Sequence, residues 1–175
     1  IRGLVPGQID AELTRSIGGA FARLVRRTEP STGRVAVGRD MRPTGVGLAA
    51  AFAEGVTAEG LGVVDLGLVS TDMLYFASGH LDIPGAVFTA SHNPAKWNGF
   101  KYKPDYGGSA SQEIVIALEE HIAAVAANGA VSSIPWDRAL ELGTGKSIDP
   151  ASSYLSQMAR LVDLRGVKDS GLRVV

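Results

Sequence analysis

The chain has 175 residues, with 17 Lys plus Arg against 18 Asp plus Glu and a net charge of −1 when His is neutral. This length allows one domain with a sizeable core, and the balanced charge excludes a general attraction to nucleic acid or anionic membranes. Without cysteine there is no disulfide or thiolate metal site, and no apolar run approaches the roughly 20 residues of a membrane span, so we expect a cytoplasmic protein without membrane or nucleic-acid partners.

Helix and strand patterns alternate over most of the chain. Asp10 is a favourable N-cap for a first helix, whose apolar residues recur at helical spacing up to Leu24, and Thr44 is expected to cap the second helix. In chain order, the patterns predict a helix after Asp10, a strand over 35–37, a helix over 44–59, a strand over 63–66, a helix over 71–78, strands over 85–90 and 99–103, and a helix over 111–127.

Strands that alternate with helices favour a parallel sheet covered on both faces. We therefore predict an α/β fold, a three-layer α/β/α sandwich with a mostly parallel, mixed sheet of about four strands. In such sheets ligands bind beyond the carboxyl ends of the strands. By this rule Arg39, Asp40 and Ser91, which all follow strands, share one rim with the functional surface.

The two ends of the chain lead us to expect a fragment of a longer, multidomain protein. The chain starts at Ile1 without Met, and residues 128–150 are rich in loop-forming residues and read as a connector. The final "LRVV" is typical of the first residues of a strand. A last helix is expected to begin at Pro150, with an inward face formed by Tyr154, Leu155, Met158 and Leu161 or Val162.

The segment "VFTASHNPAKWNGFKYKP", residues 87–104, carries the main functional signal. Its strand ends at Ser91, and the following Asn93 and Pro94 favour a turn that holds the serine in place. As a nucleophile Ser91 needs an adjacent base, but the neighbouring His92 points to the opposite side in an extended chain. The G-x-S-x-G pattern of hydrolases is absent, which argues against a serine hydrolase.

A second interpretation is that Ser91 carries or accepts a phosphoryl group. Phosphoryl transfer spreads negative charge over oxygens, so it requires cations, backbone N–H groups and usually a divalent metal near the serine. Lys101 supplies one positive charge on the returning strand. Arg2, Arg39 and Arg42 supply others if the fold brings them to the same rim. The residues alone also allow a third interpretation, in which the segment is a polar exit loop, Ser91 caps a turn and Lys101 is solvated.

Three segments together resemble the α-D-phosphohexomutases, the superfamily of bacterial phosphomannomutases and phosphoglucomutases. "TASHNP" followed by "NGFK" fits the family's loop, T-[AG]-S-H-N-P-x₃-N-G-[FI]-K, throughout residues 89–101. The opening "IRG" is similar to the family's N-terminal (D/G)-I-R-G, and "VGRDMR", residues 37–42, is similar to its V-G-x-D-x-R segment. The resemblance covers residues 1–130 as the family's domain I, and it implies that residues 131–175 are a connector, a helix and the truncated start of domain II.

By this resemblance Ser91 is the phosphoserine, which donates its phosphoryl group to a hexose 1- or 6-phosphate and recovers the other one from the bisphosphorylated sugar. His92 and Asn93 would hold the loop and contact phosphate or substrate. Lys101 would stabilise the transferred charge or assist proton transfer from the sugar hydroxyl. Arg2 would also reach the phosphoryl group. The roles of Ser91, His92, Asn93 and Lys101 follow from the family's loop and that of Arg2 from its N-terminal segment, and all agree with the charge requirement of phosphoryl transfer.

The resemblance also implies partners that these residues do not supply. Mg²⁺ would be bound through the Ser91 phosphoryl group and an Asp-rich D-G-D-G-D-R loop of domain II, a run that this sequence lacks. Hexose 1,6-bisphosphate would be the intermediate and activator, and the remaining domains of the enzyme would be needed for activity. Arg39, Asp40 and Arg42 are expected to have structural or indirect roles.

The resemblance thus predicts a phosphomannomutase or phosphoglucomutase, an intramolecular phosphotransferase of the isomerase class, of which this chain is a part that is inactive alone. The alternative is a non-catalytic module, derived from the same domain, that binds phosphosugars or regulates a partner.

Overall fold

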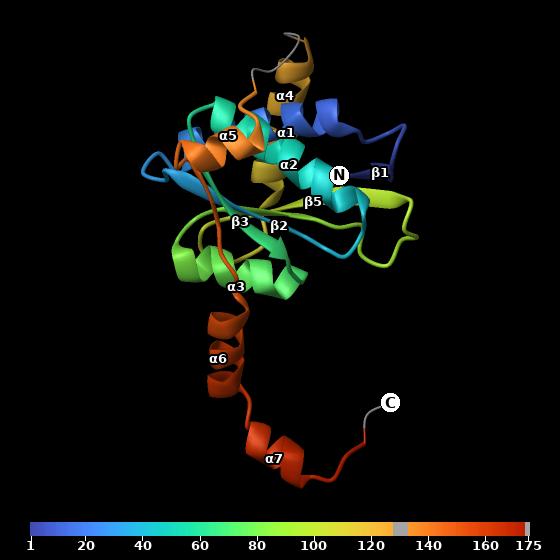
Figure 1. Cartoon of the computed structure of the whole chain (residues 1–175), viewed down its shortest axis with the longest axis vertical. Coiled ribbons are helices and arrows are strands. Elements are labelled where there is room, and N and C mark those ends of the chain that lie inside the picture. Colours follow the sequence, from blue (N-terminus) through green and yellow to red (C-terminus); the bar gives the residue numbers. More distant parts are fainter. Residues whose placement is uncertain (128–132, 174–175) are drawn as a thin grey trace.

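The computed structural model describes residues 1–127 and 133–173, which form a mixed sheet with helices on both faces (Figure 1). Its strands are β1 (Arg2–Leu4), β2 (Arg34–Arg39), β3 (Gly62–Leu68), β4 (Gly85–Phe88), β5 (Trp97–Lys103) and β6 (Gly145–Ser147). Its helices are α1 (Ala11–Thr28), α2 (Thr44–Ala58), α3 (Thr71–Leu81), α4 (Gln112–Ala127), α5 (Trp136–Glu141), α6 (Ala151–Leu161) and α7 (Leu164–Asp169). Within the described residues, none of these helices is long and apolar enough to cross a membrane.

The strand order β1-β5-β4-β2-β3-β6 confirms the predicted three-layer α/β/α sandwich. β4, β2, β3 and β6 run parallel, whereas β5 is antiparallel to both β4 and β1, so the sheet is mixed as expected. Among the described residues the sheet has six strands rather than about four. The two unexpected strands, β1 and β6, lie at its edges and have three residues each, too few to show an alternating pattern.

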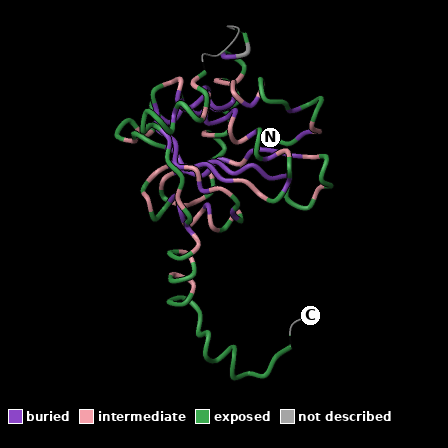
Figure 2. Tube along the Cα trace, in the orientation of Figure 1, coloured by how far each residue is buried: buried purple, intermediate pink, exposed green. Residues whose placement is uncertain are grey.

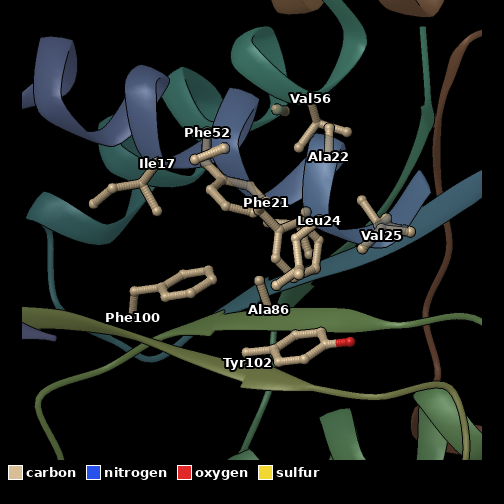
Figure 3. Packing of buried hydrophobic residues seen from close by; sticks show 14 of the residues in the cluster. Ile17, Phe21, Ala22, Leu24, Val25, Phe52, Val56, Ala86, Phe100 and Tyr102 are labelled. Carbon is tan, nitrogen blue, oxygen red and sulfur yellow. The ribbon is translucent and has the colours of Figure 1, made fainter. Parts of the chain in front are cut away.

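One face of the sheet packs under α1, α2 and α4 through a cluster of aromatic rings (Figure 3). The Phe21 ring lies 5.3 Å from that of Phe52 and 5.1 Å from that of Tyr102, and Phe52 lies 5.3 Å from Phe100. The Tyr102 hydroxyl donates to Glu29 Oε1 at 2.9 Å, and burial raises the pKa of the Glu29 carboxyl. These contacts fix β5, so its alternate residues must point to the opposite face of the sheet.

α3 covers part of that opposite face (Figure 1). It packs over β2 and β4, and its Leu74 and Ala77 belong to one buried apolar cluster with Val64 of β3 and Val87 of β4. The β5 side of this face is lined by charged residues instead, because the positions that alternate with Phe100 and Tyr102 carry lysines. The fold therefore presents an apolar half and a basic half on the same side of the sheet.

The connector and the last helices differ from the prediction. Residues 128–150 contain α5 and β6, and β6 adds to the sheet beside β3. α6 starts after Pro150, which serves as its N-cap, but the expected inward face is wrong: Leu155 is 63% exposed and Leu161 68% exposed.

The physical reason is that α6 extends away from the sandwich (Figure 2). It contacts the sandwich mainly along α3, where the Tyr154 ring packs edge-on against that of Phe76 with centroids 5.7 Å apart. Val162 is exposed, and Met158 is only half-buried. No strand forms at residues 172–173, and the last two residues of the "LRVV" prediction lie outside the described residues.

Candidate functional site

The loop that follows β4 holds Ser91 in an unusual backbone conformation. Its φ is 58°, in the left-handed region that non-glycine residues rarely adopt, and such a conformation costs about 1–2 kcal/mol. The Ser91 N–H donates to Thr89 Oγ1 at 3.0 Å, which satisfies the backbone at this point. Ser91 itself is exposed, so the serine is held by its backbone while its hydroxyl remains accessible.

Asn93 closes the turn behind the serine. Both its backbone N–H and its side-chain Nδ2 donate to the carbonyl oxygen of Ala90, at 3.1 and 2.9 Å. Its carboxamide nitrogen is therefore used to shape the loop, which agrees with the expected loop-holding role. Contact of Asn93 with phosphate or substrate stays a prediction.

The turn brings the Ser91 and His92 side chains together. Ser91 Oγ lies 3.4 Å from His92 Nδ1, slightly beyond the usual reach of a general base, and both residues are exposed. The expectation that these neighbours point to opposite sides applies to an extended chain, and the positive φ of Ser91 removes that condition. The loop therefore places an imidazole beside the hydroxyl.

Arg42, which follows β2, holds this loop through hydrogen bonds to its backbone. Its buried guanidinium, 8% exposed, donates to the carbonyl oxygens of Ser91, at 3.0 Å, and of Asn93. It also pairs with the Asp40 carboxylate, whose Oδ1 accepts the Arg42 backbone N–H at 3.0 Å. Arg39 instead lines a separate cleft, of about 140 Å³, together with Trp136. Of the charged residues in the VGRDMR segment, Asp40 and Arg42 thus hold the loop together, whereas Arg39 lies outside the site.

Arg2 lies beside the strand that leads to Ser91. Its backbone is paired with Gly99 in the antiparallel ladder of β1 and β5. The Gly99 carbonyl in turn accepts the N–H of Thr89 at 3.0 Å. A Cβ added at Gly99 would lie 2.8 Å from Arg2 Cγ and 3.1 Å from the Thr89 carbonyl oxygen, so the Arg2 side chain passes over Gly99 next to the base of the serine loop.

Lys101 shares this face of the sheet with Arg2. It lies two residues beyond Gly99 on β5 and is paired with Val87 on β4. Val87 precedes Ser91 by four residues, and β4 ends between them at Phe88. In the described residues neither Arg2 nor Lys101 forms a hydrogen bond or ion pair with the serine loop. The structure therefore places both cations on one face of the sheet, and their contact with a phosphoryl group on Ser91 stays a prediction.

One further residue, Lys103, extends the basic face, and the sequence interpretation missed its place there. Lys103 is 5% exposed, and its ammonium lies 3.5 Å from the centroid of the Tyr75 ring on α3. It also donates to the Tyr75 hydroxyl, which lies 3.1 Å from Ser109 Oγ, and this contact with Lys103 lowers the pKa of Tyr75. The available signal was the period of two from Lys101, which places Lys103 on the same face.

Asn98 and Gly99 connect the end of the loop to α2. The fully buried Asn98 donates from Nδ2 to Thr44 Oγ1 at 3.0 Å, and its Oδ1 accepts the Gly99 N–H at 2.8 Å. The predicted capping role of Thr44 is therefore wrong: Pro43 is the N-cap, and the Thr44 hydroxyl is used to anchor the loop. Gly99 has no room for a side chain, since an added Cβ would lie 2.5 Å from the Ile1 carbonyl oxygen.

The described residues do not provide a complete set of ligands for a divalent metal near Ser91. In residues 1–127 and 133–173, no group of three or more His, Asp or Glu side chains converges on a point where a metal could bind. The carboxylate beside the loop, Asp40, is paired with Arg42. The described residues alone therefore do not fit the Mg²⁺ site that the resemblance implies, apart from one oxygen donor at Ser91.

Comparisons of this chain with a family model and with known proteins all find the same protein family. Residues 1–129 match the family model described as "Phosphoglucomutase/phosphomannomutase, alpha/beta/alpha domain I". The chain is 31% identical over 169 residues to a phosphoglucomutase/phosphomannomutase of Thermococcus kodakarensis, covering 96% of this chain and 36% of that protein. It is 33% identical over 127 residues to a phosphomannomutase of Vibrio cholerae, covering 69% of this chain and 27% of that protein.

A solved structure that resembles this chain belongs to the same family as these two relatives. A phosphoglucomutase/phosphomannomutase family protein of Burkholderia thailandensis superposes with a TM-score of 0.69 at 32% identity, covering 88% of this chain and 32% of that one. In each comparison this chain spans about a third, or less, of the length of the protein it matches.

Proposed function

The chain belongs to the phosphoglucomutase/phosphomannomutase family, and we propose that Ser91 carries the phosphoryl group that such an enzyme moves between the 1- and 6-positions of a hexose phosphate. The observation that carries this proposal is the serine loop itself. Ser91 is exposed in a left-handed conformation that Thr89 and Arg42 stabilise, at the rim of a sheet face that bears Arg2 and Lys101. A polar exit loop needs none of these features.

The proposed reaction has two transfers. In the first, the bond between phosphorus and Ser91 Oγ breaks, a bond to a sugar hydroxyl oxygen forms, and the proton of that hydroxyl is transferred to Ser91 Oγ. In the second, the bond between the other phosphorus and its sugar oxygen breaks, a new bond to Ser91 Oγ forms, and the serine proton is transferred to the sugar oxygen that is released. His92, 3.4 Å from Ser91 Oγ, is placed to hold or move a proton there.

Positive charge is the second requirement, because negative charge spreads over the phosphoryl oxygens during transfer. We assign this role to Lys101 and Arg2, which share the face beside the serine loop. Asn93 would support the loop and contact the phosphate. Mg²⁺ would contribute further charge neutralisation, but since the described residues do not form its site, we assign no step to it in this chain.

The relatives are about three times as long as this chain, so the complete activity is proposed for a longer protein. We propose that residues 1–175 alone do not turn over substrate, that domain I ends near residue 130, and that 131–175 lead into domain II. Hexose 1,6-bisphosphate would act as intermediate and activator, in the cytoplasm. The substrate class is a hexose phosphate, since the relatives bear the names of both mannose- and glucose-phosphate mutases.

Intact-protein mass spectrometry tests this proposal. We define the joined protein as this chain followed by the remaining two thirds of the Thermococcus kodakarensis relative, because the alignment covers 96% of this chain. Incubated with a hexose 1,6-bisphosphate and Mg²⁺, the joined protein is expected to gain the mass of one phosphoryl group. Ser91→Ala is expected to lose this gain completely, whereas Ser111→Ala, at an exposed serine outside the loop, keeps it.

Other outcomes would point elsewhere. Binding of the sugar phosphate without any mass gain would favour the non-catalytic module. Labelling of Ser91 by a fluorophosphonate would favour a hydrolase. Turnover by the 175-residue chain on its own would contradict the proposed need for the remaining domains.

A further inference from the structure

Arg42 and Asp40 form a clamp that joins the end of β2 to the serine loop. We propose that Arg42, locked by Asp40, is a positioning residue that sets the orientation of Ser91 for phosphoryl transfer, an inference that rests on the proposed function. In the part of the chain that the structure describes, Arg42 forms no hydrogen bond with the Ser91 hydroxyl. It acts through the backbone carbonyls on both sides of His92.

The two carbonyl contacts determine how the loop faces its ligand. Because the peptide bond between Ser91 and His92 is trans, its N–H points away from its carbonyl. Holding the Ser91 carbonyl on Arg42 therefore directs the His92 N–H away from the clamp. This N–H has no acceptor among the described residues, so it is available to the oxygens of a phosphoryl group on Ser91.

The clamp is itself fixed to the strand that carries the serine. The Asp40 N–H donates to the carbonyl of Phe88, the last residue of β4, at 2.9 Å. Asp40 Oδ1 then accepts the Arg42 N–H, and its Oδ2 accepts from the guanidinium. The end of β2, the end of β4 and the loop thus form one closed set of hydrogen bonds, in which a displacement of Arg42 must move Ser91.

The chemistry of the clamp requires arginine. A planar guanidinium presents several N–H donors in a fixed arrangement and here meets a carboxylate and two carbonyls at once. The ammonium of lysine keeps the charge but not this arrangement. Because Arg42 is buried and its charge is balanced by Asp40, its effect on the phosphoryl group is expected to come from geometry rather than from attraction.

The test uses phosphoserine introduced at position 91 of the 175-residue chain by genetic-code expansion. The second pKa of its phosphate is followed by ³¹P NMR, and free phosphoserine has a value of about 6. Donors and cations around the phosphate lower this pKa. We expect a value below 6 in the wild-type background, a return toward 6 in Arg42→Lys, and no change in Arg39→Lys, whose arginine lies in another cleft.

Asp40→Asn separates geometry from charge. If the clamp acted through charge, removing a carboxylate near the phosphate would lower the phosphate pKa further. If it positions the loop, the same change raises the pKa toward 6, because Arg42 is released. Circular dichroism confirms that each variant is folded, and where Arg42→Lys does not fold, Asp40→Asn decides the result.

Two outcomes contradict the inference in different ways. A lowered wild-type pKa that neither Arg42→Lys nor Asp40→Asn raises would overturn the positioning role alone. A wild-type phosphate pKa near 6 would contradict the proposed function, and this inference with it.

Discussion

Replacing Gly55 with alanine is expected to destabilise the chain by about 1–3 kcal/mol or more. Gly55 lies where α2 crosses α1, and a Cβ added there would lie 2.1 Å from the Arg15 carbonyl oxygen. The obstacle is backbone in the middle of a helix, so no side-chain rotation can relieve it. At the same crossing, a Cβ added at Gly18 would lie 2.2 Å from the Phe52 carbonyl oxygen. Separating the helices would loosen the aromatic cluster that fixes β5.

A control in the same helix shows whether the loss of stability comes from the close contact at Gly55. Glycine to alanine within a helix normally stabilises it by up to about 1 kcal/mol. Gly47, also in α2, has no atom within 4 Å of an added Cβ. Urea denaturation should therefore show Gly47→Ala at least as stable as the wild type and Gly55→Ala clearly less stable. Equal midpoints for the two variants would show that the helices do not approach as closely as described.

Lys101→Gln is expected to slow phosphoryl transfer in the joined protein by about 10²–10³-fold, the usual effect of removing one group that stabilises developing charge. Lys101 lies on the face beside the serine loop, paired with Val87 on the strand that leads to Ser91. The rate is measured as loss of phosphate from the joined protein in single turnover with a hexose phosphate. Lys101→Arg, which keeps the charge, is expected to recover part of the rate.

Lys96 provides the matched control for this prediction. It is exposed in the loop that precedes β5, and Lys96→Gln removes an equal charge five residues before Lys101. Its rate should stay near that of the wild type. Comparable slowing by both substitutions would show that the rate depends on the total positive charge near Ser91 and that Lys101 has no specific role.

The long periodic segments were predictable from the sequence. The helices α1 to α4 and the strands β2 to β4 each carry enough apolar residues for their period to be recognised. β1 and β6 have three residues each and exist only because longer strands pair with them. The inward face predicted for α6 failed for a different reason. The helix is amphipathic, but most of its apolar side has no partner in the described residues, as the exposure of Leu155 shows.

The candidate site also has features that the sequence predicts and features that only the structure shows. Ser91 and His92 were found because they are contiguous in one motif, and the rule for parallel sheets placed Asp40 at the same rim. The clamp itself was not predictable, since Arg42 and Ser91 are 49 residues apart and their contact runs through a backbone carbonyl. The left-handed φ of Ser91 was equally hidden, because a serine gives no signal for a conformation usually occupied by glycine or asparagine.

The central claim is that Ser91 presents a phosphoryl group to the positive charges of Arg2 and Lys101. The most direct measurement is the ³¹P titration of phosphoserine at position 91 in the wild-type chain and in the double variant Arg2→Gln, Lys101→Gln. We predict a second phosphate pKa below about 6 in the wild type, rising toward that value in the double variant. A lowered pKa that the double variant leaves unchanged would mean that these two cations do not face the phosphate, and the claim would be contradicted.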